Sequence, residues 1–387
     1  MVEFTAKSEE LKKAFSVVAM AAEEGATETI GGHALFNIKN GDLYLYTTDK
    51  DKMAMAILSL TAQVTGNEED IQFTSDPKKI LALLNSSEEG TIRFSYDSES
   101  KTLNIYASED KDSYLSFASF NPKDFLMFDN ELSSAKETKK VNAGVLLGGI
   151  KFSQGFLPTD DNKKFSNMFI LNGVMYGSNG SNRIGAFESP EFSGITSMIF
   201  RRAMLSPIAT LIDKTDATDI SIRETEKIIV MLSDDGNYAF GFRKSLIEPP
   251  KFPVSMEKPK LPAINIDRNT VMKKLNRLSI TSNGEMGIKF SVNKESMTLN
   301  TVADRKSLEN MSCKRLSGPD DIEFSFECKL LKTCLGLFQT PGIDIYIDKA
   351  RCTLWSEAEL EIVEKDKKEP VRKAFKAVAL VSQARVA

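Results

Sequence analysis

One stretch of the chain carries the pattern that decides the fold: SDPKKILALL (residues 75–84), followed by TIRFSY (91–96), TLNIYA (102–107) and YLSFASF (114–120). Asp76 is a typical helix N-cap residue and Pro77 is favoured in the first helical turn, so a helix is predicted through Leu84. The three segments that follow alternate apolar and polar residues, which is the period of a half-buried strand. One helix followed by three short strands is therefore the expected building block.

The same block recurs along the whole chain, which indicates a repeat architecture. Helical patterns occur at Ser8–Met20, Ser75–Leu84, Asn142–Phe152, Phe200–Ile212, Asp267–Leu278 and Cys328–Phe338. Polar or proline-rich breaks at 130–140 and 248–262 divide the 387 residues into three predicted domains, 1–135, 136–259 and 260–387. Short strands with two helices per repeat favour antiparallel sheets with the helices on one face. We predict an α+β chain of three repeated domains, each with two helices packed on antiparallel sheets.

The residue inventory argues against common enzyme chemistry. A single histidine, His33, argues against Ser-His-Asp triads and HExxH zinc sites. The four cysteines have no CxxC spacing, and no GxxxxGK[ST] phosphate loop is present. We expect a protein that is not an enzyme and needs no metal or cofactor. An enzyme that uses carboxylates or a lysine stays open as an alternative.

The ends and the apolar segments of the sequence bear on its compartment. Met1-Val2-Glu3-Phe4 does not resemble the start of a secretory signal, and no apolar run approaches the roughly 18 residues of a membrane span. Without an export signal the cysteines are expected to be reduced thiols. The expected location is the cytoplasm.

Charge is distributed unevenly between the helices and the rest of the chain. The formal net charge is −4, yet the six predicted helices with their flanking residues carry +8, which leaves −12 elsewhere. One basic helix alone would be read as a solvated face, but six with the same bias indicate a cationic surface for a polyanion. Aromatic residues are not interleaved with these charges as in single-strand stacking platforms. The expected partner is duplex DNA bound without sequence preference.

Several patches of the sequence resemble a known family. They are Phe169–Met175 with Ser178-Asn179-Gly180 and Arg183-Ile184, Ile266–Leu275 with Ser279–Asn283, Phe324-Ser325-Phe326 with Leu330-Leu331, and the N-terminal Phe4-Thr5 with Glu9–Phe15. Together with the threefold order of elements, they resemble the bacterial DNA polymerase III β sliding clamp. The divergence leaves a phage-encoded clamp, acting in the cytoplasm of an infected host cell, as one reading.

The resemblance implies a specific architecture and role. Such clamps are head-to-tail homodimeric rings of six similar domains, with helices on the inner wall and continuous sheets outside. They encircle duplex DNA, tether the replicative polymerase and are placed on DNA by a clamp loader, with no membrane involved. A non-DNA scaffold built on the same fold stays open as the alternative.

Three sets of site residues follow from this comparison. The expected DNA-facing pool is Lys12, Lys13, Lys78, Lys79, Lys151, Arg201, Arg202, Arg268, Lys273, Lys274, Arg277, Lys329 and Lys332. By resemblance, the dimer interface is expected at Leu115, Phe117, Ile280 and Thr281, although the first two could be ordinary core. A groove for a short partner peptide is implied at Leu171, Ser178, Gly180, Arg183, Ile184, Pro253, Leu380 and Arg385. These groove residues could instead only pack a domain boundary.

The sequence departs from the family at two points of that groove. Ser382-Gln383-Ala384 stands in place of the family's apolar Met-Pro-Met run, and Val254–Glu257 lacks the interdomain arginine. Because methionines give a binding wall its adaptability, their loss predicts a groove that is narrower in specificity or shifted in position.

Overall fold

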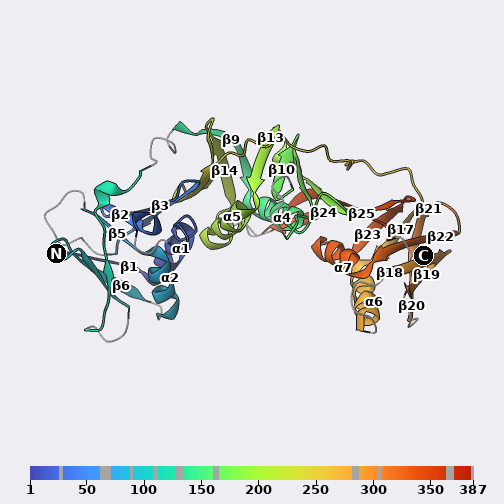
Figure 1. Cartoon of the computed structure of the whole chain (residues 1–387), viewed down its shortest axis with the longest axis horizontal. Helices are drawn as coiled ribbons and strands as arrows, with labels where there is room; N and C mark the ends of the chain where they lie inside the picture. Colours follow the sequence, from blue (N-terminus) through green and yellow to red (C-terminus); the bar gives the residue numbers. More distant parts are fainter. Residues whose placement is uncertain are drawn as a thin grey trace. The chain divides into compact units, whose positions relative to one another are not determined.

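The computed structural model describes residues 1–25, 29–61, 71–87, 90–107, 112–127, 132, 134–159, 165–280, 287–302, 307–362 and 370–384 (Figure 1). Its elements repeat one order: a strand, a helix, then three strands. The first repeat contains β1 (Val2–Lys7), α1 (Ser8–Val18), β2 (Ala34–Lys39), β3 (Asp42–Thr48), β4 (Lys52–Ser59), β5 (Ile71–Ser75), α2 (Pro77–Ser86), β6 (Thr91–Asp97), β7 (Thr102–Tyr106) and β8 (Leu115–Ala118).

The second repeat follows the same order, and the third does so with one additional strand, β21. The second contains β9 (Lys136–Asn142), α4 (Ala143–Gln154), β10 (Asn167–Leu171), β11 (Val174–Ser178), β12 (Arg183–Glu188), β13 (Ser197–Arg201), α5 (Arg202–Thr215), β14 (Asp219–Glu224), β15 (Ile228–Ser233) and β16 (Tyr238–Arg243). The third contains β17 (Ala263–Asp267), α6 (Arg268–Ile280), β18 (Gly287–Asn293), β19 (Ser296–Val302), β20 (Leu308–Ser312), β21 (Lys314–Ser317), β22 (Asp321–Glu327), α7 (Cys328–Leu337), β23 (Gly342–Ile347), β24 (Arg351–Ile362) and β25 (Val371–Ser382). Short 3-10 helices add η1 (Ile30–Gly32), η2 (Pro122–Asp124) and η3 (Pro190–Phe192).

All six predicted helices are present, each within three residues of its expected ends, so the predicted α+β class is confirmed. The strands directly before the helices were mostly missed. The predicted break at 130–140 in fact contains the start of β9, whose sequence KETKKVN has no apolar alternation. This strand forms the end of a sheet and pairs only with β14, a position where charged residues are tolerated.

In each repeat, the strand directly before each helix pairs with the sheet of the other half of the repeat. In the first repeat, β1 joins the three-stranded meander β6-β7-β8, with Val2 opposite Tyr96, while β5 joins β2-β3-β4, with Ala34 opposite Ser75. The same exchange occurs between β9 and β13 and between β17 and β22. Each half of a repeat is therefore completed by a strand from the other half.

The chain forms two compact units. The first comprises Met1–Ala143 with Ala203–Lys244, and the second Gly144–Arg202 with Ser245–Ala387. The first unit holds the sheets β1-β6-β7-β8 and β5-β2-β3-β4-β16-β15-β14-β9; the second holds β13-β10-β11-β12-β25-β24-β23-β17-β21 and β20-β19-β18-β22. Because the middle repeat is divided between these units, the three-domain boundaries stay a prediction.

Phenylalanines build the core between the two sheets of the first unit. Phe4 stacks on Phe94 with ring centroids 4.8 Å apart, and Phe36 stacks on Phe73 at 4.6 Å. Phe4 and Phe73 join these pairs at 6.2 Å, so the four-stranded sheet packs against the eight-stranded one. Helix α1 packs on α2 and on β4, and its Phe15 ring lies 5.8 Å from Phe36, so the helix covers the same face of the eight-stranded sheet as these phenylalanines.

The titratable core residues give no indication of a chemical site. All four cysteines are free and buried, and burial raises the pKa of the Cys334 and Cys352 thiols to about 12. Within the described ranges, no three His, Cys, Asp or Glu side chains come together as metal ligands. None of the helices in those ranges is long and apolar enough to cross a membrane.

Candidate functional sites

The helices carry the positive charge predicted for them. With the observed bounds, the six described helices have a formal net charge of +10, of which α6 contributes +4. The basic side chains predicted to face DNA fall into three groups, according to what each side chain contacts.

Five of them bond to a group near or beyond the end of another helix. A cation near the start of one helix bonds the chain near or just beyond the end of the other: Lys12 to Ser87 O (3.3 Å), Lys78 to Glu23 O (3.5 Å), Arg202 to Pro158 O, Arg268 to Phe338 O (2.5 Å) and Lys332 to Ser279 Oγ (3.5 Å). Because the partial negative charge of a helix is concentrated in its last turn, it favours the cations of Lys12, Arg268 and Lys332, whose partners lie there. The Glu23 and Pro158 carbonyls lie beyond the ends of α1 and α4. These five side chains, here called the helix-end cations, have a structural role whatever else they contact.

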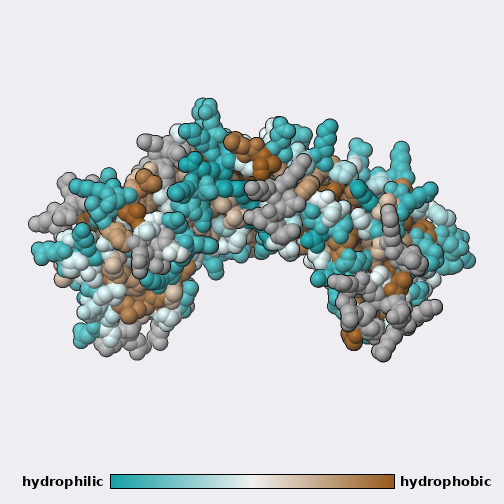
Figure 2. Space-filling model, viewed as in Figure 1, coloured by the Kyte–Doolittle hydropathy of each residue, from teal (hydrophilic) through white to brown (hydrophobic). Residues whose placement is uncertain are grey.

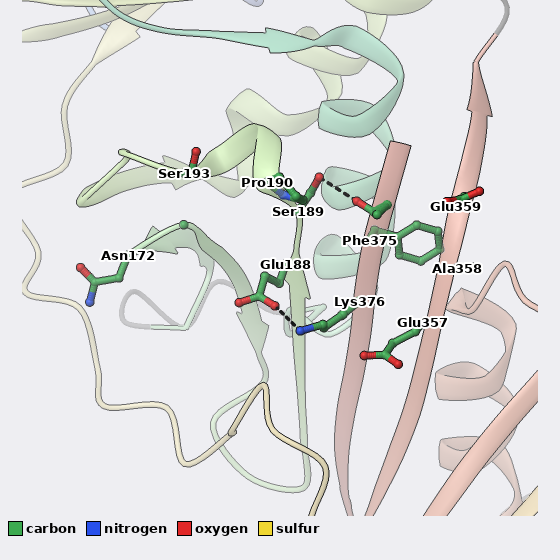
Figure 3. Close-up of a pocket in the computed structure, with 12 residues that line it drawn as sticks. Asn172, Glu188, Ser189, Pro190, Ser193, Glu357, Ala358, Glu359, Phe375 and Lys376 are labelled. Carbon is green, nitrogen blue, oxygen red and sulfur yellow. Dashed lines mark hydrogen bonds and ion pairs between the residues drawn. The ribbon is translucent and has the colours of Figure 1, made fainter. Parts of the chain in front are cut away.

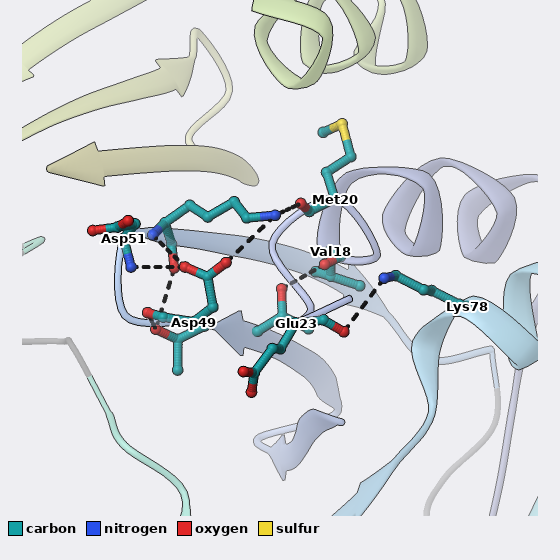
Figure 4. Close-up of polar contacts among 9 residues, drawn as sticks. Val18, Met20, Glu23, Asp49, Asp51 and Lys78 are labelled. Atoms are coloured by element: carbon teal, nitrogen blue, oxygen red, sulfur yellow. Dashed lines mark hydrogen bonds and ion pairs between the residues drawn. The ribbon is translucent and has the colours of Figure 1, made fainter. Parts of the chain in front are cut away.

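Figure 4 shows this arrangement around the end of α1. Lys78 reaches the Glu23 carbonyl from α2, while Lys52 donates to the Met20 carbonyl at 3.1 Å and Thr47 donates to the Val18 carbonyl at 2.5 Å. Of these three carbonyls, that of Val18 belongs to the last turn of α1, and those of Met20 and Glu23 belong to the segment after the helix. The three donors therefore hold the end of α1 and the segment that follows it.

A second group is held in ion pairs. Lys13 lies 2.5 Å from Asp216, and the hydrogen bond to this carboxylate raises the pKa of the lysine. Lys274 and Arg277 lie 2.6 and 3.8 Å from Glu309 in β20, and the bond from Lys274 lowers the pKa of the Glu309 carboxyl. Lys79 pairs with its own helix cap, Asp76, at 3.5 Å. Neutralised cations of this kind contribute less to a long-range field.

The third group consists of Lys151, Lys273 and Lys329, on α4, α6 and α7. All three are exposed, and none has an ion pair within the described ranges. They are the best placed of the predicted pool to meet a phosphate. Arg201 ends β13 and is half-buried, which sets it apart from this group.

Six of the eight predicted groove residues surround one cavity of about 180 Å³ in the second unit. These are Ser178, Gly180, Arg183, Ile184, Pro253 and Leu380. Ser382, where the sequence departs from the family, also lines it. The remaining lining comes from residues not predicted from the sequence: Phe165, Ser181, Asn182, Pro250, Lys251, Phe252 and Arg351. The structure therefore brings together segments from β12, the linker 245–262 and β25, while their role as a peptide groove stays a prediction.

The turn between β11 and β12 shapes one wall of this groove. The Asn179 side-chain oxygen accepts from the backbone N–H groups of Ser181, Asn182 and Arg183 at 3.1–3.2 Å, which fixes the turn. Gly180 has φ +77°, and a Cβ there would lie 2.5 Å from the Phe165 ring. Glycine is thus required both by the backbone conformation and by the close approach of Phe165.

The linker forms the opposite wall, and one aromatic side chain attaches it to the sheet. Phe252 stacks on Tyr176 with centroids 4.7 Å apart and contacts Phe169 at 5.6 Å. Val254 and Met256 continue this inward face two and four residues later, against a cluster that includes Trp355. Alternate apolar residues in a proline-rich segment were the signal that could have identified Phe252 from the sequence.

Two predicted groove residues do not contribute to the described cavity. Leu171 is followed by Asn172 and Gly173 at φ 49° and 81°, a tight hairpin turn, so it lies at the far end of β10 from the Ser178 turn. It does not line the groove. Arg385 lies outside the described residues.

The C-terminal segment beyond β25 turns away from the groove. Gln383 Oε1 accepts from the Ser325 N–H at 3.1 Å, and the Ala384 N–H donates to the Ser325 carbonyl at 3.1 Å. These bonds attach the segment to β22, which leaves Leu380 and Ser382 as the contribution of β25 to the wall. The change in the specificity or position of the groove relative to the family stays a prediction.

A second, larger groove of about 570 Å³ lies between β25, β24 and the η3 turn, and no predicted residue lines it (Figure 3). Its charged side chains are largely paired: Glu188 lies 3.2 Å from Lys376, and Glu357 lies 3.3 Å from Lys258. Ser189 donates to the Ala374 carbonyl at 3.0 Å, where β12 leaves the sheet.

Among the residues that the structure describes, the four-stranded sheets end in β1 and β8 and in β20 and β22; β8 in the first repeat and β20 in the third each pair with a single strand. Leu115 in β8 is 53% exposed, and Phe117 is half-buried. Ile280, predicted as part of the other side, is the last residue of α6 and is 83% exposed, while Thr281 lies outside the described residues. Leu308, in β20 and 58% exposed, was missed because β20 was not predicted.

The viewed face in Figure 2 is mostly hydrophilic, with hydrophobic surface over the region of β6 and α2 in the first unit.

Strand exchange within each of three repeats, with paired helices and open sheet ends, defines the architecture of the DNA-clamp fold. No protein-family model and no curated protein sequence matches the chain. Solved structures do: DNA polymerase III β subunit from Thermotoga maritima has 15% identity and a TM-score of 0.79 over 100% of both chains. The sliding clamp from Caulobacter crescentus has 14% identity and a TM-score of 0.77 over 99% of this chain and 100% of its own.

A third solved structure agrees with these two. The DnaN sliding clamp from Pseudomonas aeruginosa bound to griselimycin has 16% identity and a TM-score of 0.77 over 99% of each chain. At such low identities the similarity establishes the fold. The expected resemblance to β sliding clamps is thereby confirmed for the fold over the full length of the chain.

Proposed function

We propose that this chain is a DNA polymerase sliding clamp, a non-catalytic processivity factor that closes as a homodimeric ring around duplex DNA and tethers a polymerase. The observation that carries the proposal is the pair of open sheet edges, β8 and β20, at the two ends of the repeat order. Exposed strand edges are normally avoided because they invite pairing with another chain. A head-to-tail contact between unlike edges forms a closed ring when the rotation that relates neighbouring copies leads back to the first copy.

Exposed apolar side chains beside both edges support the same contact. Tyr114 and Leu115 are each 53% exposed next to β8, and Leu308 and Ile280 are 58% and 83% exposed on the other side. Burying a large apolar side chain contributes about 1.5–3 kcal/mol when the burial is complete. Four partly exposed side chains at each of two interfaces are therefore enough to matter for dimer stability.

The proposed contact with DNA follows from the exposed lysines of the helices. Lys151, Lys273 and Lys329 would contact phosphates without base recognition, so the ring could slide. The groove around Ser178, Arg183 and Leu380 would hold short extended peptides of the polymerase and of a clamp loader. The proposed location is the cytoplasm of a bacterial cell, or of an infected host cell if the gene is carried by a phage.

Size-exclusion chromatography with light scattering tests ring closure. We expect the wild-type chain at twice its 42.9 kDa mass, and the Leu115→Asp and Leu308→Asp variants as monomers, because a carboxylate buried between copies is unfavourable. Leu246→Asp is the matched control, since Leu246 is 97% exposed and lies in the linker. Dimers that survive both edge substitutions would contradict the proposed interface.

Retention on circular duplex DNA tests the rest of the proposal. Linearising the DNA should release a ring, and the Lys151→Glu, Lys273→Glu, Lys329→Glu triple variant should be retained less, increasingly so at higher salt. A stable monomer with no retention on circular DNA would favour a non-DNA scaffold instead.

A further inference from the structure

The charges around the smaller groove are all of one sign. Arg183, Lys251 and Arg351 line it, and no acidic residue does. None of the three has an ion pair with a carboxylate in the described ranges; Arg183 instead donates from Nη2 to the Leu157 carbonyl at 3.3 Å. Its Nε is buried and has no hydrogen-bond partner among the described residues.

The larger groove shows that this is not a general property of the surface. There Glu188 pairs with Lys376, and Glu357 pairs with Lys258, so most of its charge is balanced within the chain. Of these two grooves in the described part of the chain, the smaller one leaves a cluster of cations whose counter-charge must come from solvent or from a partner.

The walls between these cations combine apolar side chains with four polar residues, Ser178, Ser181, Asn182 and Ser382. Phe165, Ile184, Phe252 and Leu380 line the cavity together with Pro250 and Pro253. A cavity of about 180 Å³ with such walls suits a large apolar side chain. Lys251 and Arg351 are exposed at its margin, where they can reach groups that flank the inserted side chain.

We propose that this groove selects an acidic peptide: an extended segment that inserts a large apolar side chain and carries carboxylates beside it. The inference rests on the proposed function, because it names the chemistry of the partner segment at the same groove. Lys251 and Arg351 act as specificity-determining residues, through attraction to acidic peptides and repulsion of basic ones. Arg183, partly buried and already bonded to the chain, holds the turn and adds to the local field.

Nucleic acid is the less suitable anion. Single-strand binding sites stack bases on free aromatic faces along a continuous cationic track. Here the Phe252 ring is stacked on Tyr176 with an interplanar angle of 1°, and the Phe165 ring lies against Gly180. The cations surround a single hollow and do not form a track.

Fluorescence anisotropy with the full chain tests the proposal with three labelled peptides. They are Gly-Gly-Asp-Leu-Phe-Asp-Gly-Gly and its analogues with Asn or Lys in place of both Asp residues, all amidated at the C-terminus. An exposed ion pair contributes about 0.2–1 kcal/mol, so several together should make the Asp peptide roughly tenfold tighter than the Asn peptide. The Lys peptide should be the weakest. At about 0.5 M salt, where screening acts within roughly 4 Å, most of the preference should disappear.

Charge-removing variants assign the effect to the groove. Lys251→Gln and Arg351→Gln should each reduce the preference for Asp over Asn about threefold and leave binding of the Asn peptide unchanged. Lys260→Gln and Lys349→Gln are matched controls, one in the same linker and one in the turn before β24, and neither residue lines the groove. The negative charge on the partner could come from acidic side chains or from a chain terminus. If acidic side chains supply it, the amidated Asp peptide binds more tightly than the Asn peptide. If a chain terminus supplies it, an Asn peptide with a free C-terminal carboxylate regains the affinity.

Several results would overturn the proposal. These are equal affinities of the Asp and Asn peptides, an equal effect of the control variants, no binding of any peptide up to about 1 mM, or more effective competition by an oligothymidylate than by the unlabelled Asp peptide. Dimerisation and retention on circular DNA, measured on the same preparations, do not depend on any of these four peptide-binding results. Failure of the acidic preference is therefore distinguishable from failure of the clamp function.

Discussion

Gly180→Ala provides a sharp test of how the groove is built. The backbone there has φ +77°, and the added methyl would lie 2.5 and 2.6 Å from two carbons of the Phe165 ring. An L-residue in the left-handed region costs about 1–2 kcal/mol. Overpacking against a ring that must move costs about 1–3 kcal/mol more. We expect a total loss of roughly 2–5 kcal/mol in the free energy of unfolding of the second unit.

The matched control separates the two contributions. Gly194 lies in the same unit at φ +88°, with nothing within 4 Å of its Cβ position, so Gly194→Ala should cost only the backbone part. Trp355 is the single tryptophan, is buried and belongs to this unit, so its fluorescence during urea unfolding reports both variants. Equal losses for the two alanines would refute the close contact with Phe165. Weaker peptide binding by Gly180→Ala, but not by Gly194→Ala, would connect this contact to the groove.

Three further substitutions test individual contacts. The pKa of the Glu309 carboxyl lies below its ordinary 4.5, so the pairing of Glu309 with Lys274 stabilises the fold above pH 4.5 and is lost as the pH falls through the lowered pKa. Glu309→Gln should therefore reduce the acid sensitivity of thermal unfolding below pH 4.5. An unchanged pH profile would contradict this. Arg268→Gln should cost about 1–3 kcal/mol by leaving a helix-end carbonyl without its charged donor, whereas Lys273→Gln should leave urea unfolding unchanged. Phe252→Ala should free the linker from the sheet and speed tryptic cleavage after the preceding lysine several-fold; an unchanged cleavage rate would show that the stacking does not hold the linker.

The helices and the repeat were readable from the sequence because their signals are local. Caps such as Asp76-Pro77 and the apolar period of 3.6 residues act within one or two turns, so all six helices were placed near their observed ends. The charge bias of these helices is likewise a property of composition. The residues of the Ser178–Ile184 turn were identified by resemblance, and the structure collects most of them around one cavity.

Strand pairing lay beyond the sequence because it joins segments far apart in the chain. Neither the charged strand β9 nor the exchange of β1 and β5 has a local signature, since the partner that completes each sheet lies elsewhere. Missing β20 in turn hid Leu308 and its open edge. Leu171 does not line the cavity, because the hairpin turn after it places it at the end of β10 away from the Ser178 turn.

The sequence by itself determined the α+β class, the six helices and their positive charge, because these depend on neighbours within a few residues. Only the tertiary structure decided which cations are available. Lys12 and Arg268 are bonded to helix ends that become their neighbours after folding, while Lys273 stays exposed on α6. A side chain's charge is fixed by its identity, but its partners are fixed by the packing of helices and strands that are distant in the chain.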